Sequence, residues 1–149
     1  MAEFLANAVQ TISLNQPAIF TASIPCNRGY VYHEDETGNF ILRGCTPNCF
    51  ARYQVVFNGN IAIPTGGDVT PIAVALTVNG EPRLTSRAIF VPAAVETYGN
   101  VTSTAIITVP KGCCFNLAVR YVVADEDPAT TPTPVIEMQN ANLTVTRIA

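Results

Sequence analysis

The sequence predicts an all-β fold, and three observations support this prediction. Val, Ile and Thr together supply 45 of the 149 residues, and β-branched side chains suit a pleated sheet better than a helix. The 11 prolines and 9 glycines interrupt the chain at short intervals, so no long stretch keeps the apolar period of a helix. Short apolar runs separated by turn residues are typical of a β-sandwich or barrel.

Roughly ten or eleven segments have the length and residue types of strands. In chain order they are residues 8–14, 18–24, 29–33, 39–43, 49–57, 60–63, 71–79, 82–91, 103–109, 114–123 and 141–148. Asn58-Gly59 and Asn79-Gly80 each separate two apolar runs, and this dipeptide is typical of a tight hairpin turn. Residues 66–68 and 110–112 are expected to form further tight connections.

Two segments depart from the strand pattern. Residues 124–134 combine three acids, three prolines and three threonines, and because proline cannot donate to a sheet ladder we expect a surface loop. Residues 1–7 are expected to be an N-terminal tether. The remaining residues 8–149 have the size of a single domain, with no composition shift that marks a boundary.

Charge and hydropathy exclude several classes of protein. A net charge of −3 with Lys111 as the single lysine argues against a nucleic-acid binder. No apolar run approaches the ~20 residues of a membrane-spanning helix, and we expect no membrane association. The start of the chain lacks a basic region followed by a long apolar run, so we expect no cleaved secretory signal.

Two predicted strands have a second face with little charge. In residues 49–57 the apolar face alternates with a mixed face, and residues 114–123 follow the same pattern. Exposed sheet faces usually carry more charge, yet only 13% of this chain is charged, against ~25% in soluble domains. We therefore expect an oligomer that hides one sheet face in a subunit interface. The alternative is a monomer with a neutral surface rich in Thr, Asn and Gln.

The residues offer little for catalysis. His33 is the only histidine, and it lies in an acidic segment that we expect to be a solvated turn. No nucleophile elbow, P-loop or dinucleotide fingerprint is present. The acidic runs 34–36 and 125–127 offer oxygen ligands for a hard cation but lack the spacing of a calcium loop. We therefore expect no enzymatic activity and no cofactor.

The five cysteines leave three alternatives open: one or two disulfides, a zinc site, or free thiols. They are Cys26, Cys45, Cys49, Cys113 and Cys114. A disulfide would tie Cys26 to Cys45 or Cys49. The spacing between Cys45 and Cys49 is also within the range of half a zinc site, which Cys26 or a thiolate at 113 or 114 would complete. Free thiols are the third alternative, since cysteine is often simply buried.

The order of several segments resembles the jelly-roll domains of the tumour necrosis factor and complement globular-head superfamily. The resemblance covers most of residues 8–149 and lies in the succession of the segments more than in any one of them. These segments are Thr37–Arg43, Cys49–Phe57, Ile72–Pro82, Ser103–Gly112 and Asn140–Ala149. In particular, the sequence is similar to bacterial versions at the ends of collagen-like surface filaments in spore formers and to relatives among virion proteins of gut phages. Unlike the filament proteins, this chain has no collagen-like repeat.

The resemblance implies a ten-stranded, two-sheet jelly-roll sandwich that assembles as a threefold trimer. The terminal strand 141–148 would lie centrally in the inner sheet beside residues 49–57. Family members place the outer surface of that sheet at the trimer axis, which makes seven residues candidates for the trimer interface. They are Phe50, Arg52, Gln54, Val56, Asn116, Ala118 and Arg120.

The functional expectation is a non-enzymatic structural protein: a homotrimer that decorates or extends a particle surface by docking on a capsid or other surface protein. A phage virion, as a decoration or head-fibre component, is the expected location, and a bacterial cell or spore surface is the alternative. The alternative function is a lectin-like or receptor-binding module. In that case a glycan or host receptor would contact loops such as 92–102, with Tyr98, or 124–134.

Overall fold

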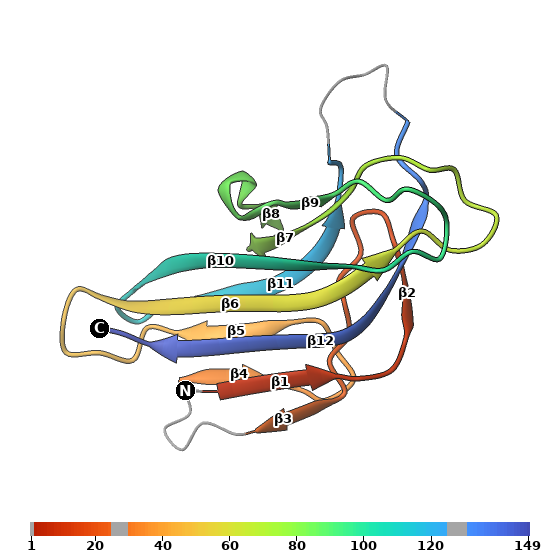
Figure 1. Cartoon of the computed structure of the whole chain (residues 1–149). Coiled ribbons are helices and arrows are strands. Elements are labelled where there is room, and N and C mark those ends of the chain that lie inside the picture. Colours follow the sequence, from red (N-terminus) through yellow and green to blue (C-terminus); the bar gives the residue numbers. More distant parts are fainter. Residues whose placement is uncertain (1, 25–29, 125–130) are drawn as a thin grey trace.

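The structure, a computed structural model, describes residues 2–24, 30–124 and 131–149. Two antiparallel sheets pack face to face as a sandwich (Figure 1), and each contains six strands. The one helical element of the described chain is a single 3-10 turn, η1 (Leu84–Ser86). These observations confirm the predicted two-sheet, all-β fold. No helix in the described ranges is long and apolar enough to cross a membrane.

The first sheet contains the longest strands. Its order is β10 (Gly99–Pro110), β6 (Phe50–Ala62), β12 (Val135–Arg147), β1 (Ala2–Ala6) and β3 (Ala22–Ile24), with β2 (Gln10–Ser13) also paired to β12. The terminal strand therefore lies beside β6 in the middle of this sheet, as predicted.

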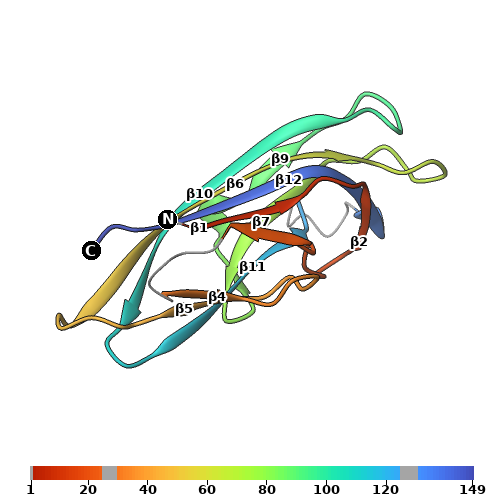
Figure 2. The ribbon, with the colours of Figure 1, turned by 90° about the horizontal axis from the view of Figure 1, so that it is seen from below.

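The second sheet packs beneath the first, and Figure 2 shows the two layers, with β6, β10 and β12 on one side and β5 and β11 on the other. Its order is β4 (Val31–His33), β5 (Phe40–Arg43), β11 (Cys114–Val122), β7 (Ile72–Val78) and β8 (Glu81–Pro82), with β9 (Ala88–Phe90) also paired to β7. The segment expected as one strand over 82–91 is thus divided into β8, η1 and β9.

The core lies between the two sheets and follows the predicted alternation. Tyr53 and Phe57 on β6 and Leu117 and Val119 on β11 have no exposed surface. Phe40 packs edge-on against Phe20, with ring centroids 5.3 Å apart. Because every second residue of each long strand enters this core, the intervening residues of the same strands face away from it.

The expected tether at residues 1–7 is wrong for most of its length, because Ala2–Ala6 is strand β1. This strand pairs with β12 on one side and with β3 on the other. Its alternating residues, with Phe4 only 3% exposed, enter the core between the sheets. The burial of these apolar side chains stabilises a strand that is too short to be recognised from its sequence alone.

The hairpin expected at Asn58-Gly59 is also wrong, because β6 runs straight through both residues. Gly59 has a packing role: a Cβ there would lie 2.8 Å from Cζ of Phe57, whose ring occupies that space. The other Asn-Gly pair is a turn as predicted, and both of its residues have positive φ angles, 53° at Asn79 and 85° at Gly80.

The loop expected at 124–134 lies largely outside the described residues. Of the part described, residues 131–134 carry no strand. The hydroxyl of Tyr121 donates to the backbone oxygen of Thr133 over 2.6 Å. This buried bond anchors the returning end of the loop against the second sheet.

Candidate functional site

The structure divides the seven expected interface residues between two opposite surfaces. Phe50, Arg52, Gln54 and Val56 face outward from β6 in the first sheet, whereas Asn116, Ala118 and Arg120 belong to β11 in the second. The apolar sides of the two sheets face each other, so their outward sides point in opposite directions. The expectation that these residues share one face is therefore wrong. Alternation shows that a strand has two faces, but it does not show which sheet the strand joins.

Two of the three β11 residues are already engaged within the chain. Ala118 is only 3% exposed. The guanidinium of Arg120 donates through Nη1 to the backbone oxygen of Asn15 over 3.0 Å. Of this group, only Asn116 is exposed.

The outward side of the first sheet carries a patch of nine neutral side chains, here called the uncharged face, with Arg52 beyond one end of it and Glu3 beside it on β1. Its residues form three successive cross-strand rows on β10, β6 and β12. The rows are Thr102–Asn58–Asn142, Thr104–Val56–Thr144 and Ile106–Gln54–Thr146. Ile106, on the edge strand β10, is 53% exposed. Covering these neutral side chains costs less hydration free energy than covering charged ones, and their hydroxyls and amides need hydrogen-bond partners in the covered state.

A network of side-chain amides lies at one end of the uncharged face. The Asn100 amide donates to the side-chain oxygens of Asn58 over 2.7 Å and Asn60 over 3.1 Å. The Asn142 amide donates to the Glu3 carboxylate over 2.6 Å. These groups use one another as hydrogen-bond partners, so the network fixes the orientation of polar side chains across β10, β6, β12 and β1.

His33 is buried, which corrects the expectation of a solvated turn residue. Its side chain has no exposed surface, and its ring stacks on Phe40 with centroids 4.4 Å apart and touches the edge of Phe4. Nε2 lies 3.0 Å from the backbone oxygen of Thr37 and donates to it, since a carbonyl oxygen only accepts. The acidic residues next to His33 in the sequence suggested a solvated turn, but the imidazole packs inward from strand β4.

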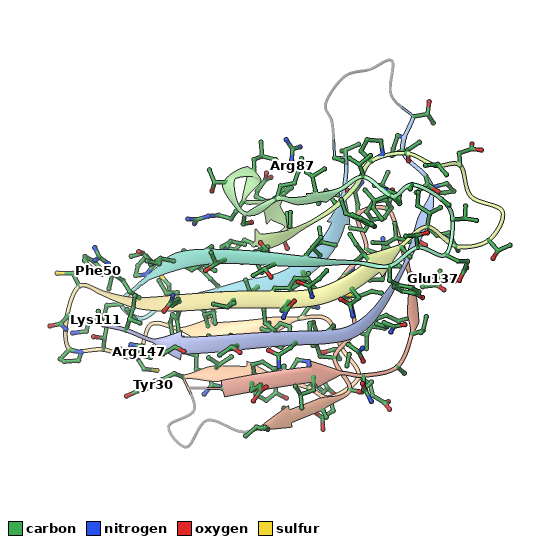
Figure 3. All side chains as sticks on the ribbon, in the orientation of Figure 1. Tyr30, Phe50, Arg87, Lys111, Glu137 and Arg147 are labelled. Atoms are coloured by element: carbon green, nitrogen blue, oxygen red, sulfur yellow. The ribbon has the colours of Figure 1, made fainter. Side chains whose placement is uncertain are left out.

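Two connections cross one end of the sandwich side by side and carry four cysteines. The β5–β6 loop and the β10–β11 turn are joined by backbone hydrogen bonds from Lys111 N to Cys49 O and from Gly44 N to Cys113 O, each 2.9 Å long. Figure 3 places Phe50 and Lys111 at this same end. Cys45, Cys49, Cys113 and Cys114 are all free thiols and all exposed.

Neither cysteine-based expectation gains support from these contacts. Cys26, which forms the expected disulfide and is one of the candidates to complete the zinc site, lies outside the described residues, as does the acidic run 125–127. Within the part of the chain that the structure describes, no group of three or more His, Cys, Asp or Glu side chains is placed to hold a metal ion.

The exposure of the thiols predicts the outcome of a labelling experiment. In reduced, native protein we expect Cys45, Cys49, Cys113 and Cys114 to react with a small maleimide before any denaturant is added, because solvent reaches each of them. Intact-mass spectrometry counts the labels. Fewer than four labels on the native protein would contradict the exposed, unpaired arrangement.

Tyr98, expected as the aromatic platform of a lectin-like loop, is tied to the body of the protein. Its hydroxyl donates to Oε2 of Glu137 over 2.8 Å. Burial, together with the hydrogen bond to Glu137 and the charge of that carboxylate, raises the pKa of Tyr98 to about 12. The hydroxyl therefore already serves a bond within the chain.

The fold defines the chain as a two-sheet jelly roll. No family model and no curated protein matches the chain. Among solved structures it is similar to the globular domain of the zebrafish complement 1qA protein, with 15% identity and a TM-score of 0.57 over 95% of this chain and 93% of that one. It is also similar to the Eiger TNF of S. frugiperda, with 16% identity and a TM-score of 0.64 over 99% and 91%.

These comparisons show that the chain has the jelly-roll fold of TNF and C1q domains. They agree with the resemblance stated from the order of sequence segments. Both similarities extend over nearly the whole of each chain, so the likeness concerns the complete sandwich and not one of its sheets.

Proposed function

We propose that this chain is a structural protein that assembles as a homotrimer through the uncharged face of its first sheet. The observation that carries the proposal is the three rows of neutral side chains on β10, β6 and β12. A surface of threonine, asparagine and glutamine with Val56 at its centre and Ile106 at the β10 edge can be covered without burying an unpaired charge. The outward surface of the second sheet carries Arg43 and Arg120, whereas on the first sheet Arg52 lies outside the three rows.

The proposed role is non-enzymatic. The burial of His33 between Phe4 and Phe40 supports it, because an imidazole enclosed in this way does not reach a substrate in solvent. The proposed location is the surface of a particle, with a phage virion as the candidate and a capsid or other surface protein as the docking partner. The resemblance to virion jelly rolls and the low charge of the chain support this location.

Native mass spectrometry of the purified protein tests the assembly. We expect a species with three times the chain mass of 15.9 kDa. A monomer at micromolar concentration would refute the trimer. The location needs a separate measurement, which is peptide mass spectrometry of particles purified from the source culture. Particles free of this chain would refute the virion role and leave the trimer standing.

A further inference from the structure

A shallow hollow lies on the outward side of the second sheet, away from the uncharged face. It has a volume of about 210 Å³ and is lined by Tyr32, Glu34, Thr37, Asn39, Ile41 and Asn116. Tyr32 on β4 and Asn116 on β11 both pair with Ile41 on the strand between them, β5. Three neighbouring strands therefore hold three of the six lining residues and give the hollow a rigid base, and the other three lie in the connection between β4 and β5.

Tyr32 differs from the other four tyrosines of the chain. Tyr53 and Tyr121 are buried in the core, and the hydroxyl of Tyr98 is bonded to Glu137. The ring of Tyr30 is covered by the guanidinium of Arg147, whose Cζ lies 4.4 Å from the ring centroid. Tyr32 is 48% exposed, so the most exposed tyrosine is the one that lines the hollow.

The polar groups around Tyr32 are not engaged with one another. Within the described chain, no hydrogen bond involves the Tyr32 hydroxyl, the Glu34 carboxylate or the side-chain amides of Asn39 and Asn116. The amides on the opposite side of the sandwich, such as Asn100, do bond to their neighbours. The hollow thus presents one carboxylate, two amides and a phenol whose hydrogen-bonding capacity is directed at solvent.

We propose that this hollow binds a single neutral sugar residue. A pyranose ring has an apolar C–H face, which packs on an exposed aromatic ring such as that of Tyr32. Its hydroxyl groups both donate and accept hydrogen bonds, so they match an amide, which does the same, and a carboxylate, which accepts. The Cζ of Arg43 lies 5.9 Å from the centroid of the Tyr32 ring, farther than the 4.4 Å that separates the Cζ of Arg147 from the centroid of the Tyr30 ring.

The size and position of the hollow define the ligand and its accessibility. At about 210 Å³ the hollow is smaller than the roughly 300–1,000 Å³ of pockets for drug-sized ligands, which fits one sugar ring and not an extended chain. Its place on the second sheet leaves it open when the uncharged face of the first sheet is covered. The inference therefore does not depend on the trimer.

NMR titration of the full chain with the methyl glycosides of glucose, galactose, mannose and N-acetylglucosamine tests the proposal. At least one of these sugars is expected to bind with millimolar affinity and to shift the amide signals of Tyr32, Glu34, Ile41 and Asn116. A glycan array then distinguishes a free sugar from the end of a longer glycan. Tyr32→Ala should weaken binding by at least about tenfold, and Asn116→Ala by about two- to tenfold.

Asn48→Ala is the matched control for Asn116→Ala. Asn48 is an exposed asparagine in the β5–β6 loop, it does not line the hollow, and its side chain makes no hydrogen bond in the described structure. This control should bind like the unaltered protein. Three results would overturn the proposal: no binding of any of the four sugars, shifts that lie elsewhere on the surface, or equal weakening by Asn48→Ala and Asn116→Ala.

Discussion

Ile106→Glu is expected to convert the homotrimer into monomers. Ile106 is 53% exposed in a single chain and lies at the end of the row that continues through Gln54 and Thr146. In the proposed trimer this row is covered, so each chain would bury a carboxylate beside the guanidinium of Arg83, which already donates to the backbone oxygen of residue 106 over 3.2 Å. Taking the carboxylate out of water costs on the order of 3 kcal/mol per chain, and repulsion among the three carboxylates adds to that cost. Native mass spectrometry and sedimentation would report the single-chain mass.

Ile19→Glu is the matched control for this prediction. Ile19 is an isoleucine of similar exposure, 45%, in the connection between β2 and β3, outside the three rows of the uncharged face. The same charge placed there should leave the trimer intact. If both variants remained trimeric, the uncharged face would not be the interface. If both became monomeric, the effect would not be specific to this face.

The fold class and most of the strands could be predicted from the sequence because strand alternation and turn chemistry are local. The apolar face predicted for residues 49–57 is the inward face of β6, which includes Tyr53 and Phe57, and the Asn79-Gly80 turn follows from its dipeptide. The pairing of the terminal strand with β6 followed from the order of segments in the family that the chain resembles.

The features that could not be predicted depend on contacts between distant parts of the chain. Strand β1 exists because β12 and β3 flank it, and β12 lies at the other end of the chain. His33 is buried because Phe4 and Phe40 enclose it from two other strands. The assignment of β11 to the second sheet separates its outward residues from those of β6, and no local pattern contains that information.

The hollow beside Tyr32 was missed for the same reason. The sequence shows five tyrosines but not which of them stays exposed. Asn116 and Glu34 are 82 positions apart, and only the pairing of β4, β5 and β11 places them around one surface. A binding site built across paired strands can be recognised only after the register of those strands is known.

Gly44→Ala is expected to cause the largest loss of stability among single substitutions at the cysteine-bearing end. A Cβ at this position would lie 2.1 Å from the backbone oxygen of Pro110 and 3.1 Å from that of Cys113. Both obstacles are backbone atoms, so no side-chain rotation relieves the contact. The two crossing connections would have to separate, which breaks the hydrogen bonds of Gly44 to Cys113 and Gly112. We expect a loss of about 3 kcal/mol in the free energy of unfolding.

Gly112→Ala separates this steric effect from the general cost of replacing a glycine. Gly112 lies in the adjacent β10–β11 turn with φ of +79°, and nothing lies within 4 Å of a Cβ built there. Its replacement should therefore cost only the ~1–2 kcal/mol of a left-handed backbone conformation. Urea unfolding of both variants, with reductant present so that no thiol chemistry intervenes, measures the difference. If Gly44→Ala proved no more destabilising than Gly112→Ala, the close approach of the two connections would not be what holds this end of the sandwich together.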